Sequence, residues 1–569
     1  MNLTALHIMH KSTWVLPVWL LTLGGIPGES WAQFLPDAGQ VRQSIEQSRP
    51  VGPLLPHREM PALTPATVGV QDGLRVAVRE FRFVGNSLMD TAQLQAVVQP
   101  LAGRELDFSD LKRAAGILAA HYREAGWVVR VYLPAQDIAG GVVTFNILET
   151  QLGEVRLEGP VPTRVLPSEL QAYFTTASGF RRALRTADLE RAQLLVDDLP
   201  GVQVSATLVA GEDAGQTNIL LRAADKPMVS GDIALDNTGA RATGSSRVTA
   251  NIYLNSPGLR GELISMNTLH SAGSDYARVA MTVPVPQAEW RNGLRLGVNA
   301  STLNYKVVDG PSSNVVTPIH GRSGAMGLEL RYPLLRALRQ NLHLSGFLDS
   351  KTFFTEDSQV RSDYASNSLR FDVTGDLSDD LGAGGVSNAA VQLLWGQLTD
   401  MKAHNQIDTI GRRYHKINYS LSRNQYFSDR HALLLSWGGQ YAVQRLDSSE
   451  RFYIGGVQSV RAYPASELGG DKGNLFTAEW RWFFYPDWSL VAFADKGRVA
   501  SVATSIEAAN CWVLRGHGLS VNWQAPGGWL ARTTWARRTG VNPQPTGTGT
   551  DSDGSLRYNR FWFTASVNF

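Results

Sequence analysis

The chain has 569 residues, which is too many for one ordinary domain. Its 53 basic and 51 acidic residues leave a formal charge of +2, so no net field favours nucleic acid as a partner. The single cysteine, Cys511, excludes an intramolecular disulfide and a CxxC metal or redox motif. A hydrophobic content of 43% fits a soluble protein, and it fits equally a membrane β-barrel, in which only every second strand residue faces lipid.

Residues 1–32 have the features of a secretory signal. Lys11 precedes the apolar stretch Ser12–Ile26, and Ser30-Trp31-Ala32 fits a cleavage site of small residues. The apolar stretch is too short to span a bilayer as a helix, and we find no longer one elsewhere. We therefore expect a mature chain that begins near Gln33, outside the cytoplasm.

Residues 33–49 are expected to hold a short amphipathic helix. The segment Asp37–Ser48 has a helix-forming composition, with Val41 and Ile45 four residues apart. Five prolines follow in residues 50–75, a composition that favours an extended, semi-rigid linker. The residues alone leave a frayed tail and a docked functional helix equally open.

Residues 76–149 and 150–226 are predicted to be two tandem copies of one β-α-α-β-β unit. The strand Phe81–Gly85 recurs as Val155–Gly159, at an offset of 74 positions. In the first copy Ser109 is expected to cap the second helix, and a strand is expected over Val142–Leu148. A period of about 75 residues with complete secondary structure indicates two domains rather than a solenoid.

From residue 227 to residue 569 the hydrophobic period changes to two. In Asn367–Thr374, for example, Leu369, Phe371 and Val373 share one face. We count about 16 such segments long enough to cross a bilayer, with tight turns between some and long loops at 305–321, 447–473, 498–511 and 540–557. A soluble sandwich also alternates, but the number and length of the segments favour an antiparallel outer-membrane barrel.

The loop 447–473 and the strand after it carry the most informative motifs. The segment Arg451–Tyr463 has the sequence RFYIGGVQSVRAY, and Phe493-Ala494-Asp495-Lys496-Gly497 follows about thirty residues later. Between them, Glu479 and Arg481 are expected to face the lumen. Taken singly, Arg461 suggests a solvated loop arginine and Asp495 a surface carboxylate. Together they can form a fork of two parallel hydrogen bonds.

With these motifs the chain resembles the hemolysin secretion/activation proteins, the outer-membrane transporters of bacterial two-partner secretion. Their superfamily combines barrels with polypeptide-transport-associated (POTRA) domains. The family's Val-Arg-Gly-Tyr motif occurs here as Val460-Arg461-Ala462-Tyr463, preceded by Gly455-Gly456, and Ala462 replaces the glycine. The family's partner motif occurs as Phe493, Asp495 and Gly497. The resemblance covers nearly the whole mature chain and implies that Arg461 meets Asp495 on the barrel wall.

The resemblance also implies a mechanism and partners. An unfolded exoprotein would bind the POTRA domains in the periplasm, either by adding a strand to a sheet edge or by lying in a helix–strand groove. The N-terminal plug helix would leave the pore, the Arg461 loop would shift, and the exoprotein would cross without ATP and fold outside as a β-helix. A groove in the first POTRA domain is expected at Leu111, Leu118, Tyr122, Val143 and Phe145. Outer-membrane lipid and the barrel-assembly machinery, which would recognise the terminal Phe569, complete the expected partners.

No catalytic pattern is present, such as Gly-x-Ser-x-Gly, His-Glu-x-x-His or a phosphate loop, so we expect no enzyme activity, metal or cofactor. Two other classes of protein compete with the transporter. An assembly factor of the same superfamily usually carries more than two tandem domains. A diffusion porin has no reason to carry any. The exoprotein itself stays open among hemolysins, adhesins and contact-dependent toxins.

Overall fold

The computed structural model describes residues 36–47, 75–138, 140–178, 182–213, 215–286, 288, 292–309, 319–357, 361–402, 412–502 and 511–569. The predicted signal, and the predicted linker apart from residue 75, fall outside these ranges. Within them, no helix is both long enough and apolar enough to cross a membrane.

The first tandem unit has the predicted order of strands and helices. Its sheet has the order β2-β5-β4, so β5 is central and the other two strands are its edges. The second helix starts earlier than expected, because Asp107 rather than Ser109 is its N-cap and accepts from the Asp110 backbone N–H at 2.8 Å. The elements are β1 (Val76–Ala77), β2 (Glu80–Val84), α2 (Thr91–Val98), η1 (Gln99–Leu101), β3 (Glu105–Leu106), α3 (Phe108–Glu124), β4 (Val129–Tyr132) and β5 (Val142–Glu149).

The second unit repeats this arrangement and contacts the barrel. Its sheet has the order β6-β8-β7, and its apolar side chains form a core separate from that of the first unit. Arg336 on the barrel binds Asp198 through two hydrogen bonds of 2.8 Å, at the end of the second helix of this unit. The elements are β6 (Gln151–Leu157), α4 (Pro167–Ser178), α5 (Thr186–Asp197), β7 (Val202–Ala210) and β8 (Gln216–Asp225).

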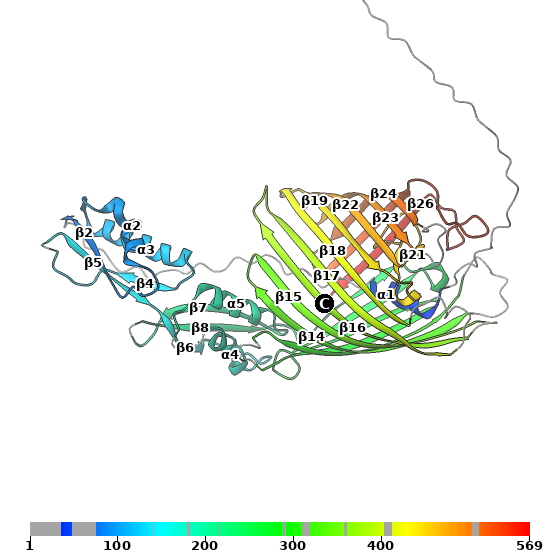
Figure 1. Ribbon diagram of the computed structural model, residues 1–569, viewed down its shortest axis with the longest axis horizontal. Helices are drawn as coiled ribbons and strands as arrows, with labels where there is room; N and C mark the ends of the chain where they lie inside the picture. Colours follow the sequence, from blue (N-terminus) through cyan, green and yellow to red (C-terminus); the bar gives the residue numbers. More distant parts are fainter. Residues whose placement is uncertain are drawn as a thin grey trace, which may run out of the picture.

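The rest of the chain forms one closed antiparallel barrel of 16 strands, as the period of two predicts (Figure 1). The strand β26 pairs with β9 and closes the ring. The strands are β9 (Val229–Asp236), β10 (Arg247–Asn255), β11 (Leu263–Ser271), β12 (Ser274–Pro284), β13 (Arg295–Lys306), β14 (His320–Arg336), β15 (Gln340–Glu356), β16 (Arg361–Asp379), β17 (Gly385–Lys402), β18 (Arg413–Ser428), β19 (His431–Ala442), β22 (Lys472–Tyr485), β23 (Trp488–Ala500), β24 (Cys511–Gln524), β25 (Trp529–Arg538) and β26 (Asn559–Asn568).

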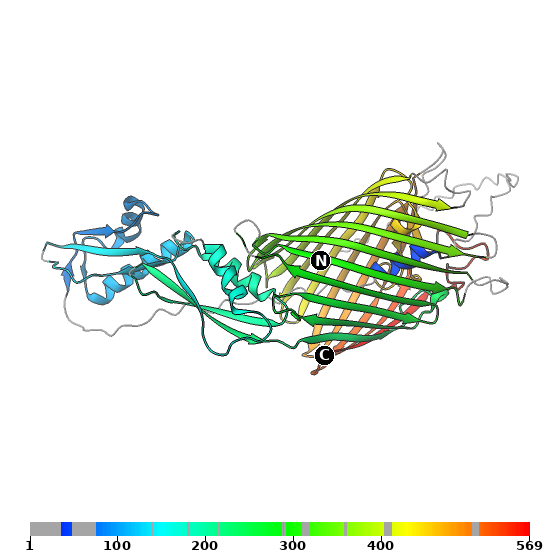
Figure 2. The same cartoon turned by 90° about the horizontal axis from the view of Figure 1, so that it is seen from below.

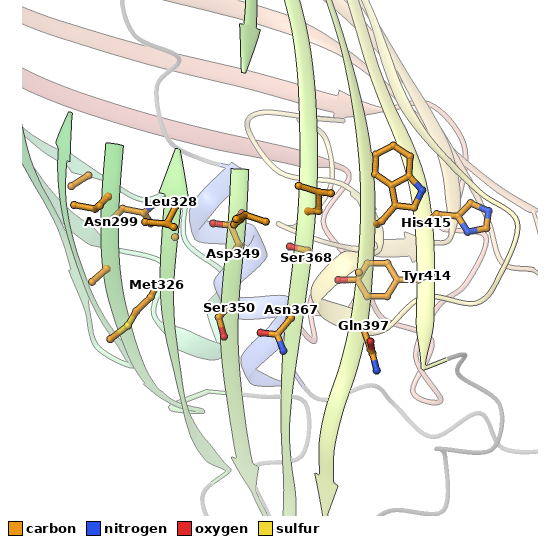
Figure 3. Close-up of a pocket in the computed structure, with 18 of the residues that line it drawn as sticks. Asn299, Met326, Leu328, Asp349, Ser350, Asn367, Ser368, Gln397, Tyr414 and His415 are labelled. Atoms are coloured by element: carbon orange, nitrogen blue, oxygen red, sulfur yellow. The ribbon is translucent and has the colours of Figure 1, made fainter. Parts of the chain in front are cut away.

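The two faces of the wall differ in character. A shallow cavity of about 1120 Å³ crosses β12 to β18 on the outer face (Figure 3). Its lining includes some of the most exposed apolar side chains of the chain, with Met326 at 71% and Leu328 at 55%. Large apolar groups exposed over many strands are expected where a wall faces lipid.

The helix α1 (Ala38–Gln47) lies inside the barrel, far along the chain from the strands that surround it (Figures 1 and 2). Val41 and Ile45, the pair that indicated an amphipathic helix, are buried against Leu303 and Tyr305 of the inner wall. The tandem units lie at one end of the barrel, and α1 lies nearer to the other end (Figure 2).

Candidate functional site

The segment between β19 and β22, residues 443–471, folds back into the lumen, and we call it the arginine loop. It contains η5 (Ser448–Glu450) and a short hairpin of β20 (Phe452–Ile454) and β21 (Leu468–Gly470). Val460, Ala462 and Tyr463 at its tip have no exposed surface. They pack with Phe493 and Leu514 of the wall, so the tip is part of a small apolar core inside the barrel.

Arg461 and Asp495 form the fork that the two motifs suggested. Arg461 Nε lies 2.9 Å from Asp495 Oδ2 and Nη2 lies 2.7 Å from Oδ1, and the Arg461 backbone N–H donates to the same carboxylate. Thr477 adds a fourth donor to Asp495. Both residues are buried, so charge-assisted hydrogen bonds within the protein replace the water that would otherwise solvate the two charges.

The lumen charges beside this pair belong to the same network. Arg461 Nη1 lies 2.8 Å from Glu479, and the other oxygen of Glu479 lies 2.8 Å from Arg481. The guanidinium of Arg461 also stacks over the Phe493 ring, 3.5 Å from its centroid. Phe493 therefore supplies a flat apolar face to the cation that Asp495 and Glu479 neutralise.

Small residues allow the loop backbone to approach the wall. A Cβ atom on Gly497 would lie 2.9 Å from Val460 Cγ2. The methyl group of Ala462, which replaces the family glycine, fits beside Gly516, where a Cβ would lie 2.6 Å from it. Gly455 and Gly456 have φ values of 108° and 95°, a region that favours glycine and that lets the hairpin turn.

A second contact joins the tip to the loop between β25 and β26. Glu467 accepts hydrogen bonds from the Ser552 backbone, the Ser552 hydroxyl and the Asn542 amide. Burial raises the pKa of Glu467 to about 7, although these hydrogen bonds act to lower it. Beneath it, Asp551 is fully buried and binds Arg538 at 2.7 Å. Our reading of the sequence missed this contact, because nothing in either loop marks positions 467 and 552 as partners.

A third contact holds the start of the arginine loop. Glu450 lies between Lys351 of β15 and Lys416 of β18, at 3.2 and 2.9 Å. Burial would raise the pKa of such a carboxyl, but the two ammonium groups hold the pKa of Glu450 at about 2. This triad was also missed, because its members lie on strands and a loop far apart in the sequence.

The helix α1 sits between this start and the wall. Arg42 donates to the hydroxyls of Ser301 and Ser323 on the inner face of the barrel. A Cβ on Gly39 would lie 2.8 Å from Ser449, so helix and loop touch closely. A cavity of about 1040 Å³ remains in the lumen between α1, the arginine loop and the strands near the closing seam. Helix and loop together fill much of the channel that a wide barrel would otherwise leave.

The predicted groove of the first POTRA domain is wrong. Leu111, Leu118, Tyr122, Val143 and Phe145 are all at most 2% exposed and form the core of that domain. Helical and strand spacing identified the faces that pack inward, and those faces cannot receive a peptide. The strand β5 is also central, with both edges paired. The terminal Phe569, in contrast, is 56% exposed.

A closed barrel of 16 strands behind two tandem α+β domains, with a helix and an arginine loop in its lumen, defines the class of outer-membrane POTRA–barrel proteins. The model for the haemolysin secretion/activation proteins ShlB, FhaC and HecB matches residues 215–522, and the model of the ShlB-type POTRA domain matches residues 76–150. The chain belongs to this family, and it is an outer-membrane transporter of two-partner secretion.

Named relatives and solved structures agree with this family. The chain is 27% identical over 469 residues to the heme/hemopexin transporter HuxB of Haemophilus influenzae, covering 78% of this chain and 80% of the relative. It is 23% identical over 487 residues to the outer-membrane transporter CdiB of Escherichia coli, covering 83% and 77%. The structure of Escherichia coli CdiB superposes with a TM-score of 0.66 at 18% identity, over 93% of this chain and 95% of the other.

Proposed function

We propose that this transporter recognises one exoprotein in the periplasm, passes it unfolded and without ATP through the barrel, and has no catalytic activity of its own. The observation that carries the proposal is the pair of occupants in the lumen. A solute channel gains nothing from a helix and a loop that fill it. A conduit for an extended chain needs a closure that substrate can displace.

The route begins at the tandem domains, which the exoprotein meets first. An extended chain adds to a sheet edge by backbone hydrogen bonds and places alternate side chains in pockets. The edges of the first sheet are β2 and β4, and Val84 and Tyr132 on them are exposed. These edges replace the buried groove as the proposed docking surface, with modest affinity per residue, as a transporter requires.

The lumen opens next. The helix α1 is held by apolar contacts and by a few hydrogen bonds to uncharged acceptors, so it leaves first, and the linker of residues 50–75 follows it. The Arg461–Asp495 fork and its Glu479 partner keep the arginine loop against one side of the barrel wall, while the exoprotein passes along the other side of the lumen. Folding of the exoprotein outside, as a β-helix, then opposes backsliding. Removal of residues 1–32 and recognition of Phe569 by the assembly machinery precede this cycle.

The exoprotein itself is proposed only as a class. The names of the relatives connect HuxB with heme and hemopexin, and CdiB with transport across the outer membrane. A large secreted β-helical protein with a binding or toxic activity fits both. An assembly factor is the second candidate, because BamA from Haemophilus ducreyi shares the fold with a TM-score of 0.51 at 13% identity.

Deleting the gene in its host separates the two candidates. Loss of one large exoprotein from the supernatant or cell surface, with other outer-membrane barrels unchanged, supports the transporter. A general fall in outer-membrane barrels supports the assembly factor and contradicts the transporter. Restoring the full chain on a plasmid is the control, and it must restore the missing protein.

A further inference from the structure

We propose that the outer face of β23 to β25 binds the phosphorylated head group of an outer-leaflet glycolipid. Lys496 and Arg498 of β23, Arg515 of β24 and Arg537 of β25 are exposed, and we call these four residues the basic patch. They alternate with buried residues such as Asp495 and Gly516, so they lie on the face away from the lumen.

The register of the sheet brings these cations together. Lys496 lies directly opposite Arg515, and Arg537 lies opposite His517. Side chains opposite each other in an antiparallel pair have Cβ atoms about 5 Å apart, and like charges placed there repel. The positive charges of Lys496 and Arg515 therefore repel each other, and an anion bound between the two strands would remove this repulsion.

No carboxylate supplies that anion within the described residues. None of the four side chains forms a salt bridge there, and Arg498 instead donates to the Cys511 thiol at 2.9 Å, a weak acceptor. The positions facing the patch on neighbouring strands are uncharged, with Asn474 opposite Arg498 and Asn559 opposite Arg537. A ligand with several anionic oxygens matches this arrangement, because Lys and Arg are the usual phosphate partners.

The depth of the patch identifies the ligand as a lipid. Trp488 of β23 and Trp523 of β24 form a tilted ring pair, with centroids 6.1 Å apart, at the end nearest the tandem domains, where an aromatic girdle marks the periplasmic interface. Lys496 lies eight residues farther along β23, which is about 21 Å of height at a rise of ~3.4 Å and a tilt of ~40°. An apolar band is about 25 Å tall, so the patch lies at the outer head-group level.

The opposite side of the barrel offers a comparison, at the loop-side ends of β14 to β16. Arg322 and Arg361 there flank the Phe354 ring, and Glu356 lies opposite Arg361 and 3.6 Å from His320. Charges of both signs alternate in that region. The basic patch differs from that region because no carboxylate lies opposite any of its four cations.

The inner face of the same strands holds the arginine loop, so a lipid bound outside could affect that loop. Asp495, which holds Arg461, is the neighbour of Lys496, and Gly516, which receives Ala462, is the neighbour of Arg515. A lipid that bridges β23, β24 and β25 from outside would brace the part of the wall that holds the arginine loop. This consequence rests on the proposed function, whereas lipid binding itself does not.

The test uses the purified full-length chain in detergent. Native mass spectrometry counts bound diphosphorylated lipid A for the wild type, for K496Q/R515Q/R537Q, and for a matched control on the opposite wall. The control is R322Q/R361Q/R413Q, in which Arg413 is the exposed first residue of β18. We expect at least a tenfold loss of affinity for the patch variant and less than twofold for the control. Equal losses, or equal binding of dephosphorylated lipid A by the wild type, would overturn the proposal.

Two further measurements keep the test decisive. Inorganic pyrophosphate as competitor separates a lipid site from a free-phosphate site, and we expect no displacement at millimolar concentration, whereas full displacement would overturn the lipid assignment. If the patch variant fails to fold, the native Cys511 beside Arg498 serves as reporter. Its labelling by a maleimide should slow several-fold with diphosphorylated lipid A and not with the dephosphorylated form. An unchanged rate with both would contradict the site.

Discussion

The two occupants of the lumen are held by different chemistry. The helix α1 is fixed by neutral acceptors, since Arg42 donates to serine hydroxyls and the Ala38 N–H donates to Thr355. The arginine loop is fixed by buried opposite charges at its tip and at its start. Arg42 is a charged donor, but its acceptors on the wall are uncharged, so its loss costs hydrogen bonds only, whereas removing one partner of a buried ion pair leaves a buried charge without its counter-charge. We therefore expect the helix to be displaced more easily than the loop.

The largest effect is expected from breaking the tip of the loop. D495A breaks the buried ion pair and leaves Arg461 with Glu479, which it shares with Arg481, so the cost is about 3–5 kcal/mol for removing one partner of a buried pair. We expect D495A and R461A each to reduce secretion of the exoprotein at least tenfold, and the double variant to be no worse than either. R461K, which keeps the charge but loses the fork, should lie between. A double-mutant cycle on secreted protein with additive effects would contradict this coupling.

The next effect concerns the start of the loop, where both occupants meet. E450Q leaves Lys351 and Lys416 without their shared carboxylate. We expect a fall in the temperature at which the folded barrel unfolds on a heat-modifiability gel, because two buried ammonium groups repel. The variant K416M/E450Q removes one of those charges and should regain part of the loss. If E450Q unfolds at the wild-type temperature, the triad has no stabilising role.

A smaller effect is expected from a variant that weakens the contacts of the helix α1 but not those of the arginine loop. R42A removes the hydrogen bonds from α1 to Ser301 and Ser323 and leaves the ion pairs of the arginine loop intact, at a cost of about 1.5–3 kcal/mol for hydrogen bonds to a charged group. We expect a higher mean conductance in planar bilayers with unchanged unfolding temperature. Q47A, at an exposed position of the same helix, is the control. An unchanged conductance for R42A would mean that the apolar contacts and the hydrogen bonds of Ala38 and Gln43 retain the helix without Arg42.

The smallest effect is a pH dependence of the loop. The pKa of Glu467 is raised by burial to about 7, so docking favours its protonated form. Docking therefore loses stability as pH rises from about 4.5, the ordinary value of the free carboxyl, to about 7, and is constant above that. A spin label at Q458C in a C511S background should become more mobile over this range. E467Q should abolish this change in mobility. If the label at Q458C is equally mobile at pH 5 and pH 8 while Glu467 is present, the predicted pH dependence is contradicted.

Periodicity predicted the architecture because it reports which faces are buried. It gave the tandem units, the barrel and the place of α1's apolar face at Val41 and Ile45. The same property led to the wrong peptide groove. Leu118 and Phe145 follow the regular helix and strand spacing because their side chains belong to the domain core, and core side chains cannot bind a peptide. The partners of Glu450 and Glu467 could not be predicted, since pairing across a barrel depends on strand register and loop conformation, which one sequence does not encode locally.

The closing seam has a consequence for how this barrel is made. The strand β26 is the last of the chain, and it pairs with β9, so contacts such as the one from the Phe563 N–H to Asn237 join residues 326 positions apart. The entropic cost of such loop closure comes before any gain from the contact, and non-local strand pairing is slow. The cylinder cannot close before β26 has been synthesised and exported. Until then two unpaired strand edges must be shielded, so barrel closure waits for β26.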